Sequence, residues 1–193
     1  MKKFELTNEF ITNMFGTKLF RIRALVEFGD VEAGELGGYV EKESNLGHDD
    51  NAWVYDNARV CGDAQVSGDA LVYGNARVCG DARVCGDARV CGDAQVSGDA
   101  LVYGNARVCG DARVCGDARV CGNGDYAYAH GFGSVNRTTT FFRLKDGGVG
   151  VRCGCFYGTL AQFRDKIRET HGETKKAQEY LMLADLMKLR FEK

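Results

Sequence analysis

The chain has 193 residues, 45% of them hydrophobic, and its 25 Lys and Arg residues against 27 Asp and Glu residues give a formal net charge of −2. This charge argues against the strongly basic surface that binds nucleic acids or anionic membranes. No apolar run approaches the roughly 18 residues of a membrane-spanning helix, and the N-terminal sequence MKKFELTNEF lacks the apolar stretch of a signal peptide. We therefore expect a cytoplasmic protein with no membrane and no nucleic-acid partner.

Residues 3–28 have the pattern of a strand pair, and residues 18–28, in which two sets of side chains alternate, form its stronger member. A repeat array exposes unpaired strand edges at both ends, and these edges need covering to prevent unwanted pairing. We therefore expect the N-terminal segment to close one end of the array that follows.

The centre of the chain is a six-residue repeat of the form (D/N)-A-x-V-x-G. Its Val series runs without a gap from Val54 to Val120, which makes twelve hexads, and can be followed upstream to Val40 and Leu46 across two extra residues. Ala and Val are two positions apart and so point to the same side of a strand, while the residue between them points to the other side. Gly followed by Asp or Asn makes a corner. The pattern predicts a β-solenoid with Val and Ala inside.

Residues 63–92 and residues 93–122 are identical, and each copy is five hexads long. If three hexads make one coil, the five hexads between equivalent residues are one whole coil plus two hexads. The two equivalent side chains therefore lie on different faces of the solenoid. Tyr73 and Tyr103 would then lie on different faces. The duplication therefore adjusts the length of the solenoid and does not extend a binding surface, so we expect function at the ends.

The C-terminal part predicts a β-hairpin and two helices. Residues 138–156 read as a hairpin around an Asp-Gly-Gly turn. In the helix that follows, Thr159 and Gln162 form a capping box, and the helix ends at Gly172. The last helix, over about 174–191, is apolar on more than one stripe and so either packs on two sides or has an exposed apolar face. We expect three segments: an N-terminal β cap at 1–37, the solenoid at 38–124, and a C-terminal ββαα cap at 125–193.

The hexads resemble the left-handed parallel β-helix of the hexapeptide-repeat (LpxA-like) family, in which a large aliphatic residue alternates with a small one. The lead-in FGDVEAGELGGYV at 28–40 and the stretch NAWVYDNA at 51–58 are similar to a bacterial and phage subgroup of transferases or polymer-forming proteins of undefined function. Residues 140–172 resemble the tail of phage relatives. The resemblance implies a mainly β fold with triangular coils of three hexads each. Because Gly follows Val by two positions here and by one in many members, a flat coil of two hexads is the alternative.

Many hexapeptide-repeat proteins are acyltransferases that resemble one another in placing a His at a coil seam as the general base. His48 lies beside the two extra residues and is the catalytic candidate under this alternative, in which acetyl-CoA or another acyl-CoA is the cofactor. His130 reads as a turn residue in a Gly-rich segment. His171 reads as a favourable residue at a helix C-terminus.

Seven of the nine cysteines occupy the position after the Val of a hexad. With three hexads per coil two pairs would stack, Cys61 on Cys79 and Cys91 on Cys109. Parallel side chains give a poor torsion for a disulfide, so we expect free thiols that fill corners. The C-x-C of Cys153 and Cys155 lacks the four converging ligands of a zinc site. We therefore expect no resident metal and no cofactor, with these two cysteines as the only candidate metal ligands.

The sequence as a whole predicts a non-catalytic β-solenoid scaffold or interaction protein of phage or bacterial origin. Its ends would contact a protein partner or further copies of the chain. Residues 1–56 carry a net charge of −5 (6 basic, 11 acidic) and residues 123–193 a net charge of +4 (12 basic, 8 acidic). Opposite charges favour head-to-tail contact between molecules, so a homo-oligomer is expected. The alternative is an acyltransferase-like enzyme that uses His48.

Overall fold

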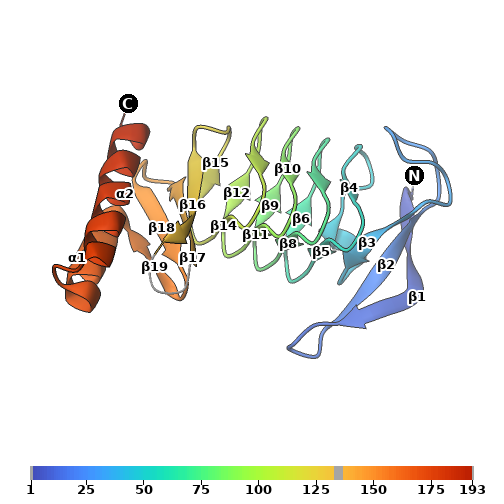
Figure 1. The fold of residues 1–193 in the computed structure, drawn as a ribbon. Coiled ribbons are helices and arrows are strands. Elements are labelled where there is room, and N and C mark those ends of the chain that lie inside the picture. Colours follow the sequence, from blue (N-terminus) through green and yellow to red (C-terminus); the bar gives the residue numbers. More distant parts are fainter. Residues whose placement is uncertain (1, 133–136, 193) are drawn as a thin grey trace.

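The computed structural model describes residues 2–132 and 137–192. A β-solenoid lies between an N-terminal hairpin and a C-terminal sheet that carries two helices (Figure 1). The elements are β1 (Phe4–Thr12), β2 (Lys18–Ala24), β3 (Leu36–Val40), the short 3-10 helix η1 (Glu43–Asn45), β4 (Trp53–Val54), β5 (Arg59–Val60), β6 (Gln65–Val66), β7 (Leu71–Val72), β8 (Arg77–Val78), β9 (Arg83–Val84), β10 (Arg89–Val90), β11 (Gln95–Val96), β12 (Leu101–Val102), β13 (Arg107–Val108), β14 (Arg113–Val114), β15 (Arg119–Val120), β16 (Tyr126–Phe132), β17 (Arg137–Arg143), β18 (Val149–Cys153), β19 (Phe156–Thr159), α1 (Leu160–His171) and α2 (Lys175–Phe191).

Strands three hexads apart in the sequence pair in parallel. Val60 of β5 pairs with Val78 of β8, and Val90 of β10 pairs with Val108 of β13. The pairs build three parallel sheets, one on each face of the solenoid. Their strand orders are β3-β5-β8-β11-β14, β4-β7-β10-β13 and β6-β9-β12-β15. This spacing confirms the triangular coil and rules out the flat coil of two hexads. The solenoid has about five coils.

The Val and Ala of each hexad form the core. Every one of them from Ala52 to Val120 has an exposed fraction of 0%. Burying a Val side chain completely contributes about 1.5–3 kcal/mol relative to leaving it in water, so a uniform row of small and branched side chains is a strong core for a thin prism. Each strand is only two residues long because the next residues already form the corner.

The N-terminal segment continues one face of the solenoid. β1 and β2 form an antiparallel hairpin, β2 pairs with β3, and β3 pairs in parallel with β5 through Tyr39 and Val40. Leu46 bridges Val66, so the weak upstream trace of the repeat is confirmed across the two extra residues. The boundary expected at residue 37 falls inside β3, and the hairpin and the first coil share one sheet.

The C-terminal segment is an antiparallel sheet of order β16-β17-β18-β19 with α1 and α2 packed on it. The expected hairpin is β17 with β18, and the Thr159–Gln162 capping box begins α1, which Gly172 ends. The prediction that His130 is a turn residue is wrong, because it lies on β16, where pairing with β17 overrides the turn preference of its glycine neighbour. Residues 133–136, inside the expected cap, lie outside the described residues.

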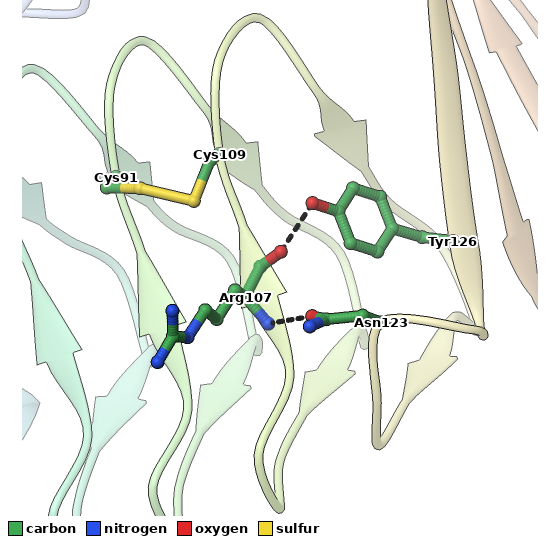
Figure 2. Close-up of a disulfide and its surroundings, with 5 residues drawn as sticks. All are labelled: Cys91, Arg107, Cys109, Asn123 and Tyr126. Atoms are coloured by element: carbon green, nitrogen blue, oxygen red, sulfur yellow. Dashed lines mark hydrogen bonds between the residues drawn. A yellow bond between two sulfur atoms is a disulfide. The ribbon is translucent and has the colours of Figure 1, made fainter.

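Cys91 and Cys109 form a disulfide, shown in Figure 2. The prediction that all nine cysteines are free thiols is therefore wrong at this pair. Val90 pairs with Val108, so Cys91 and Cys109, which follow them, are stacked on each other. Their Cα atoms lie 4.7 Å apart, within the range of a disulfide. The other seven thiols are free, namely Cys61, Cys79, Cys85, Cys115, Cys121, Cys153 and Cys155.

The two copies of the thirty-residue block place equivalent residues on different faces, as expected. Leu71 lies on the sheet that contains β10, whereas its copy Leu101 lies on the sheet that contains β15. Residues 75–92 and residues 105–122 are identical, so the C-terminal cap would meet the same three hexads if one copy were absent.

We predict that deletion of residues 93–122 leaves a folded protein that is shorter by about 8 Å, because thirty residues are one and two-thirds coils at a rise of about 4.8 Å per coil. Small-angle scattering would measure the maximum dimension, and a lower urea m-value would report the smaller buried surface. The matched control deletes residues 63–93, which leaves Val96 five positions after Val60 instead of six and puts the following hexads one residue out of phase. An in-phase deletion that is as unstable as this control would contradict the prediction.

A second prediction concerns the corner glycines. Gly68 has a φ of +70°, and a Cβ there would lie 2.9 Å from the backbone nitrogen of Gly86 in the next coil. Gly68→Ala should lower the free energy of unfolding by about 1–3 kcal/mol, through backbone strain and contact with the neighbouring coil. The control Gly122→Ala has open space around the new Cβ and no positive φ. Urea denaturation measures the free energy of unfolding of both variants, and equal values would contradict the prediction.

Candidate functional site: the two capped ends of the solenoid

Lys3 closes the first edge of the β4 sheet. Its Nζ donates hydrogen bonds to the backbone oxygens of Asp50 at 2.7 Å and Ala52 at 2.9 Å, and its side chain is 3% exposed. Burial lowers the pKa of Lys3, and the carboxylate of Asp50 opposes this shift. The ammonium group also lies 4.6 Å from the centre of the Phe28 ring. One buried charge therefore satisfies carbonyls that have no earlier coil to pair with.

Asn45 satisfies the first backbone carbonyls of the neighbouring sheet, which begins with β6. It is completely buried, and its Nδ2 donates to the backbone oxygens of Gly62 at 3.0 Å and Ala64 at 2.8 Å. Three carboxylates accept the first corner N–H groups, at distances of 2.6–3.0 Å: Glu41 from Gly62, Asp50 from Gly68, and Asp56 from Gly74. The first coil thus has side-chain partners at each of its three corners.

His48 belongs to this N-terminal cap. Its Nδ1 accepts the backbone N–H of Lys3 at 3.1 Å, its Nε2 lies 3.0 Å from a carboxylate oxygen of Glu43, and its ring stacks on Phe4 at 4.5 Å between centroids. Because Nδ1 accepts, the ring proton of the neutral form is on Nε2 and is donated to Glu43. A general base needs a free nitrogen lone pair, and both nitrogens of this ring are engaged.

Side chains of the C-terminal segment cover the last coil. The backbone N–H of Arg107 donates to Oδ1 of Asn123 at 2.9 Å, and the hydroxyl of Tyr126 donates to the backbone oxygen of Arg107 (Figure 2). The backbone N–H of Arg113 donates to Oγ1 of Thr140 at 2.9 Å. On the third face, Lys145 donates its N–H to the backbone oxygen of Asp117, and Leu144 bridges Ala118. Both open edges of the solenoid are therefore occupied.

The outer face of α2 is apolar and exposed. Its inner face packs against α1 and the sheet through Tyr180, Leu183, Ala184, Met187 and Phe191. Met182, Leu186 and Leu189 are 72%, 56% and 70% exposed. Because these three follow one another at i, i+4 and i+7, they form one stripe. The helix packs on one side only, and we call the exposed residues Met182, Leu186 and Leu189 the α2 stripe.

The opposite end also presents apolar side chains. The turn between β1 and β2 carries Met14 and Phe15, each 85% exposed. Figure 1 shows this hairpin extending sideways from the end of the solenoid opposite the helices. We call Met14 and Phe15 the hairpin tip. The hairpin and the α2 stripe thus belong to opposite ends of the solenoid.

Two hollows at the C-terminal end contain the remaining candidate residues. A cavity of about 400 Å³ is lined by Asp111, Arg113, His130, Arg137, Thr138 and Gly154. A second, of about 270 Å³, is lined by Arg137, Cys153, Cys155, Phe156, Phe163, Lys166, Ile167, Thr170, His171 and Tyr180. His130 is hydrogen-bonded to Thr138 at 2.8 Å, and His171 ends α1 with its ring stacked on Tyr180. Neither His lies near His48, which is at the other end of the solenoid.

Cys153 and Cys155 lie close in sequence but in different surroundings. Cys153 contacts the hydroxyl of Thr139 at 3.2 Å and that of Tyr180 at 3.8 Å, whereas Cys155 is exposed in the turn before β19. Burial raises the pKa of Tyr180 to about 12, which keeps its hydroxyl protonated as a hydrogen-bond donor. Within residues 2–132 and 137–192, no three His, Cys, Asp or Glu side chains are grouped as metal ligands.

Sequence reasoning missed the buried capping residues Lys3 and Asn45. A signal for both was present, because the first coil of any solenoid needs donors for its unpaired carbonyls, and Asn45 directly precedes Leu46, the first residue on its face of the core. The partners of Lys3 are almost fifty residues away, so the sequence alone could not identify them.

A family model described as the YdcK Beta solenoid repeat matches residues 64–80 and 94–110. The two segments are thirty residues apart, so they are the same stretch of the two copies. A comparison with curated proteins found no match. The match supports a β-solenoid repeat protein. In the part of the chain that the structure describes, neither helix has the length and apolar character needed to cross a membrane.

We predict that Lys3→Met lowers the free energy of unfolding by about 2–4 kcal/mol, because the buried backbone oxygen of Ala52 and the half-buried one of Asp50 both lose their donor. Lys2→Met is the matched control. Lys2 forms an exposed ion pair with Glu43, and such pairs contribute less than about 1 kcal/mol. Urea denaturation followed by circular dichroism measures both variants. A Lys3→Met protein as stable as the Lys2→Met protein would show that the cap does not depend on this ammonium group.

Proposed function

We propose that the protein is a non-catalytic scaffold whose solenoid holds two binding ends at a fixed separation, and that each end binds a second copy of the chain, head to tail. The distribution of exposed apolar side chains supports this proposal. Of the eleven large hydrophobic side chains that are exposed among the described residues, only Tyr103 belongs to the regular coils. The other ten lie in the segments at the two ends, where an isolated monomer would leave them in water.

Charge is the reason for choosing a second copy as the partner. The N-terminal acidic excess is concentrated in residues 27–56, which hold nine acidic residues against one Lys. At the other end, Lys188 and Arg190 lie in the last turn of α2, beside the α2 stripe. The acidic segment follows β2 and lies at the end of the solenoid from which the hairpin extends, so one molecule offers an acidic end with the apolar hairpin tip and a basic end with the α2 stripe. Such ends are complementary, although salt screens them beyond about 8 Å.

A head-to-tail contact is heterologous, because the two surfaces differ. It produces a ring if the rotation between copies closes and an open filament if it does not. The resemblance to hexapeptide-repeat proteins supports a bacterial or phage origin, a left-handed coil and a polymer-forming role. Trimers that pack through coil faces are common among those proteins, so a side-by-side trimer is the competing form of assembly.

The prediction uses two variants that each disable one end. Met14→Ser with Phe15→Ser removes the hairpin tip, and Leu186→Ser with Leu189→Ser removes most of the α2 stripe. In multi-angle light scattering the wild-type chain should grow beyond a dimer as concentration rises, and more so at low salt. Each variant alone should be monomeric, and an equimolar mixture should stop at a 1:1 dimer, because one intact tip then meets one intact stripe.

The outcomes of the mixing experiment separate the alternatives. A hairpin variant that still dimerises by itself would indicate an isologous contact between α2 stripes, and a trimer in both variants would indicate packing through coil faces; either result contradicts the proposal. Lys188→Ser is the control for serine on an exposed position of the same helix. Binding of acetyl-CoA that His48→Ala abolishes would instead support the acyltransferase alternative.

A further inference from the structure

Cys61 and Cys79 occupy the same register as the disulfide pair, on a different face of the solenoid. Cys61 follows Val60 of β5 and Cys79 follows Val78 of β8, and these two valines pair across adjacent coils. The backbone N–H of Cys61 donates to the oxygen of Val78 at 2.9 Å. In the disulfide pair, the N–H of Cys91 donates to the oxygen of Val108 at the same 2.9 Å. The two pairs therefore have equivalent backbone positions.

The free pair is also prepared for reaction. The neighbouring thiol of Cys61 holds the pKa of Cys79 below its usual range, and the guanidinium group of Arg77 adds to this effect. The thiol of Cys79 raises the pKa of Cys61, with burial and the carboxylate of Glu41 acting in the same direction. Cys79 therefore ionises first, while Cys61 keeps its proton. Both side chains are only half-buried, so a small reagent can reach them.

The remaining coil cysteines have no such neighbour. Cys115 lies on the same face as the free pair, but the residue stacked one coil before it is Ser97. Cys85 and Cys121 lie on the third face, on either side of Tyr103. Among the described coil residues, the pattern therefore stacks Cys on Cys at two places only, of which one is already a disulfide.

We propose that Cys61 and Cys79 form a reactive dithiol site whose co-reactant is a low-molecular-weight disulfide of the glutathione class. This site is independent of the end contacts proposed above, because it lies between the first two regular coils. It would be a site of covalent modification, at which two thiols are oxidised to a disulfide. This disulfide would be a second cross-link between coils.

The chemistry is two successive thiol–disulfide exchanges. The Cys79 thiolate attacks one sulfur of oxidised glutathione, forms a mixed disulfide and releases one glutathione thiolate. Cys61 then loses its proton to solvent, and its thiolate attacks the Cys79 sulfur, forms the Cys61–Cys79 bond and releases the second glutathione thiolate. Overall the protein dithiol is oxidised by two electrons, and one glutathione disulfide is reduced to two thiols.

The experiment uses the full chain with Cys91→Ser and Cys109→Ser, so that the existing disulfide does not contribute. The reduced protein is incubated with oxidised glutathione, alkylated with N-ethylmaleimide and mapped by mass spectrometry without reduction. We expect a Cys61–Cys79 cross-link. Cys61→Ser should instead trap one glutathionyl group on Cys79, because the resolving thiol is absent. Serine already occupies the equivalent position at Ser67 and Ser97, so these variants are compatible with the fold.

Cys115 is the matched control within the same chain. Burial raises its pKa, so at pH 7, in the chain that keeps Cys61, the Cys79 thiol should be consumed roughly fivefold faster or more than the Cys115 thiol. Adding Ser97→Cys to a chain that lacks Cys61 and Cys79 should create a new cross-link to Cys115 by register alone. If the parent chain formed no Cys61–Cys79 bond, or if Cys79 and Cys115 reacted at equal rates, the dithiol site would be refuted.

Discussion

The hydrogen-bond ladder between residues one coil apart is the constraint on which the rest of the molecule depends. Within the array, the backbone N–H of Arg59 donates to the oxygen of Ala76, and the same pattern recurs from coil to coil at about 2.9 Å. A backbone N–H or C=O group inside the array is therefore hydrogen-bonded to an adjacent coil, whichever side chain points outward. Only the first and last coils lack a neighbour, and unpaired buried backbone groups are costly. This is why buried polar side chains such as Lys3, Asn45 and Thr140 gather at the ends.

The extent to which the fold could be predicted follows from the same constraint. The hexad specifies its own inward and outward positions, so the buried Val and Ala, the corners and the α1 capping box could be predicted from local sequence. The coil size could not, because coils of two hexads and of three both fit a period of six, and only the pairing of Val60 with Val78 decides. β16 was missed because Gly131 suggests a turn, whereas pairing with β17 makes the segment a strand, and the partners of Lys3 are nearly fifty residues away.

The duplication creates contacts between cysteines that neither copy would form by itself. Copies are five hexads apart, whereas stacked residues are three hexads apart, so each residue meets a different position of the repeat in the next coil. Cys91 belongs to the first copy and Cys109 to the second, and their disulfide exists only where the copies join. The Cys61–Cys79 contact arises likewise where the first copy joins the hexad before it. Both pairs of stacked cysteines therefore result from the offset between the five-hexad copy and the three-hexad coil, and in one pair, Cys91 and Cys109, the register brings the Cα atoms close enough for the disulfide that torsion alone argued against.

The number of hexads also determines how the two ends are oriented. Each hexad occupies one of three faces, so it adds about 1.6 Å of length and rotates everything after it by about 120°. A whole coil changes length alone, whereas the thirty-residue block changes length and leaves the α2 stripe rotated by two-thirds of a turn relative to the hairpin tip. In a head-to-tail assembly this rotation is repeated at every copy, so it decides between a ring and a filament. Lengthening the solenoid by one block thus preserves the core and both caps, yet it would change the shape of the head-to-tail assembly proposed above.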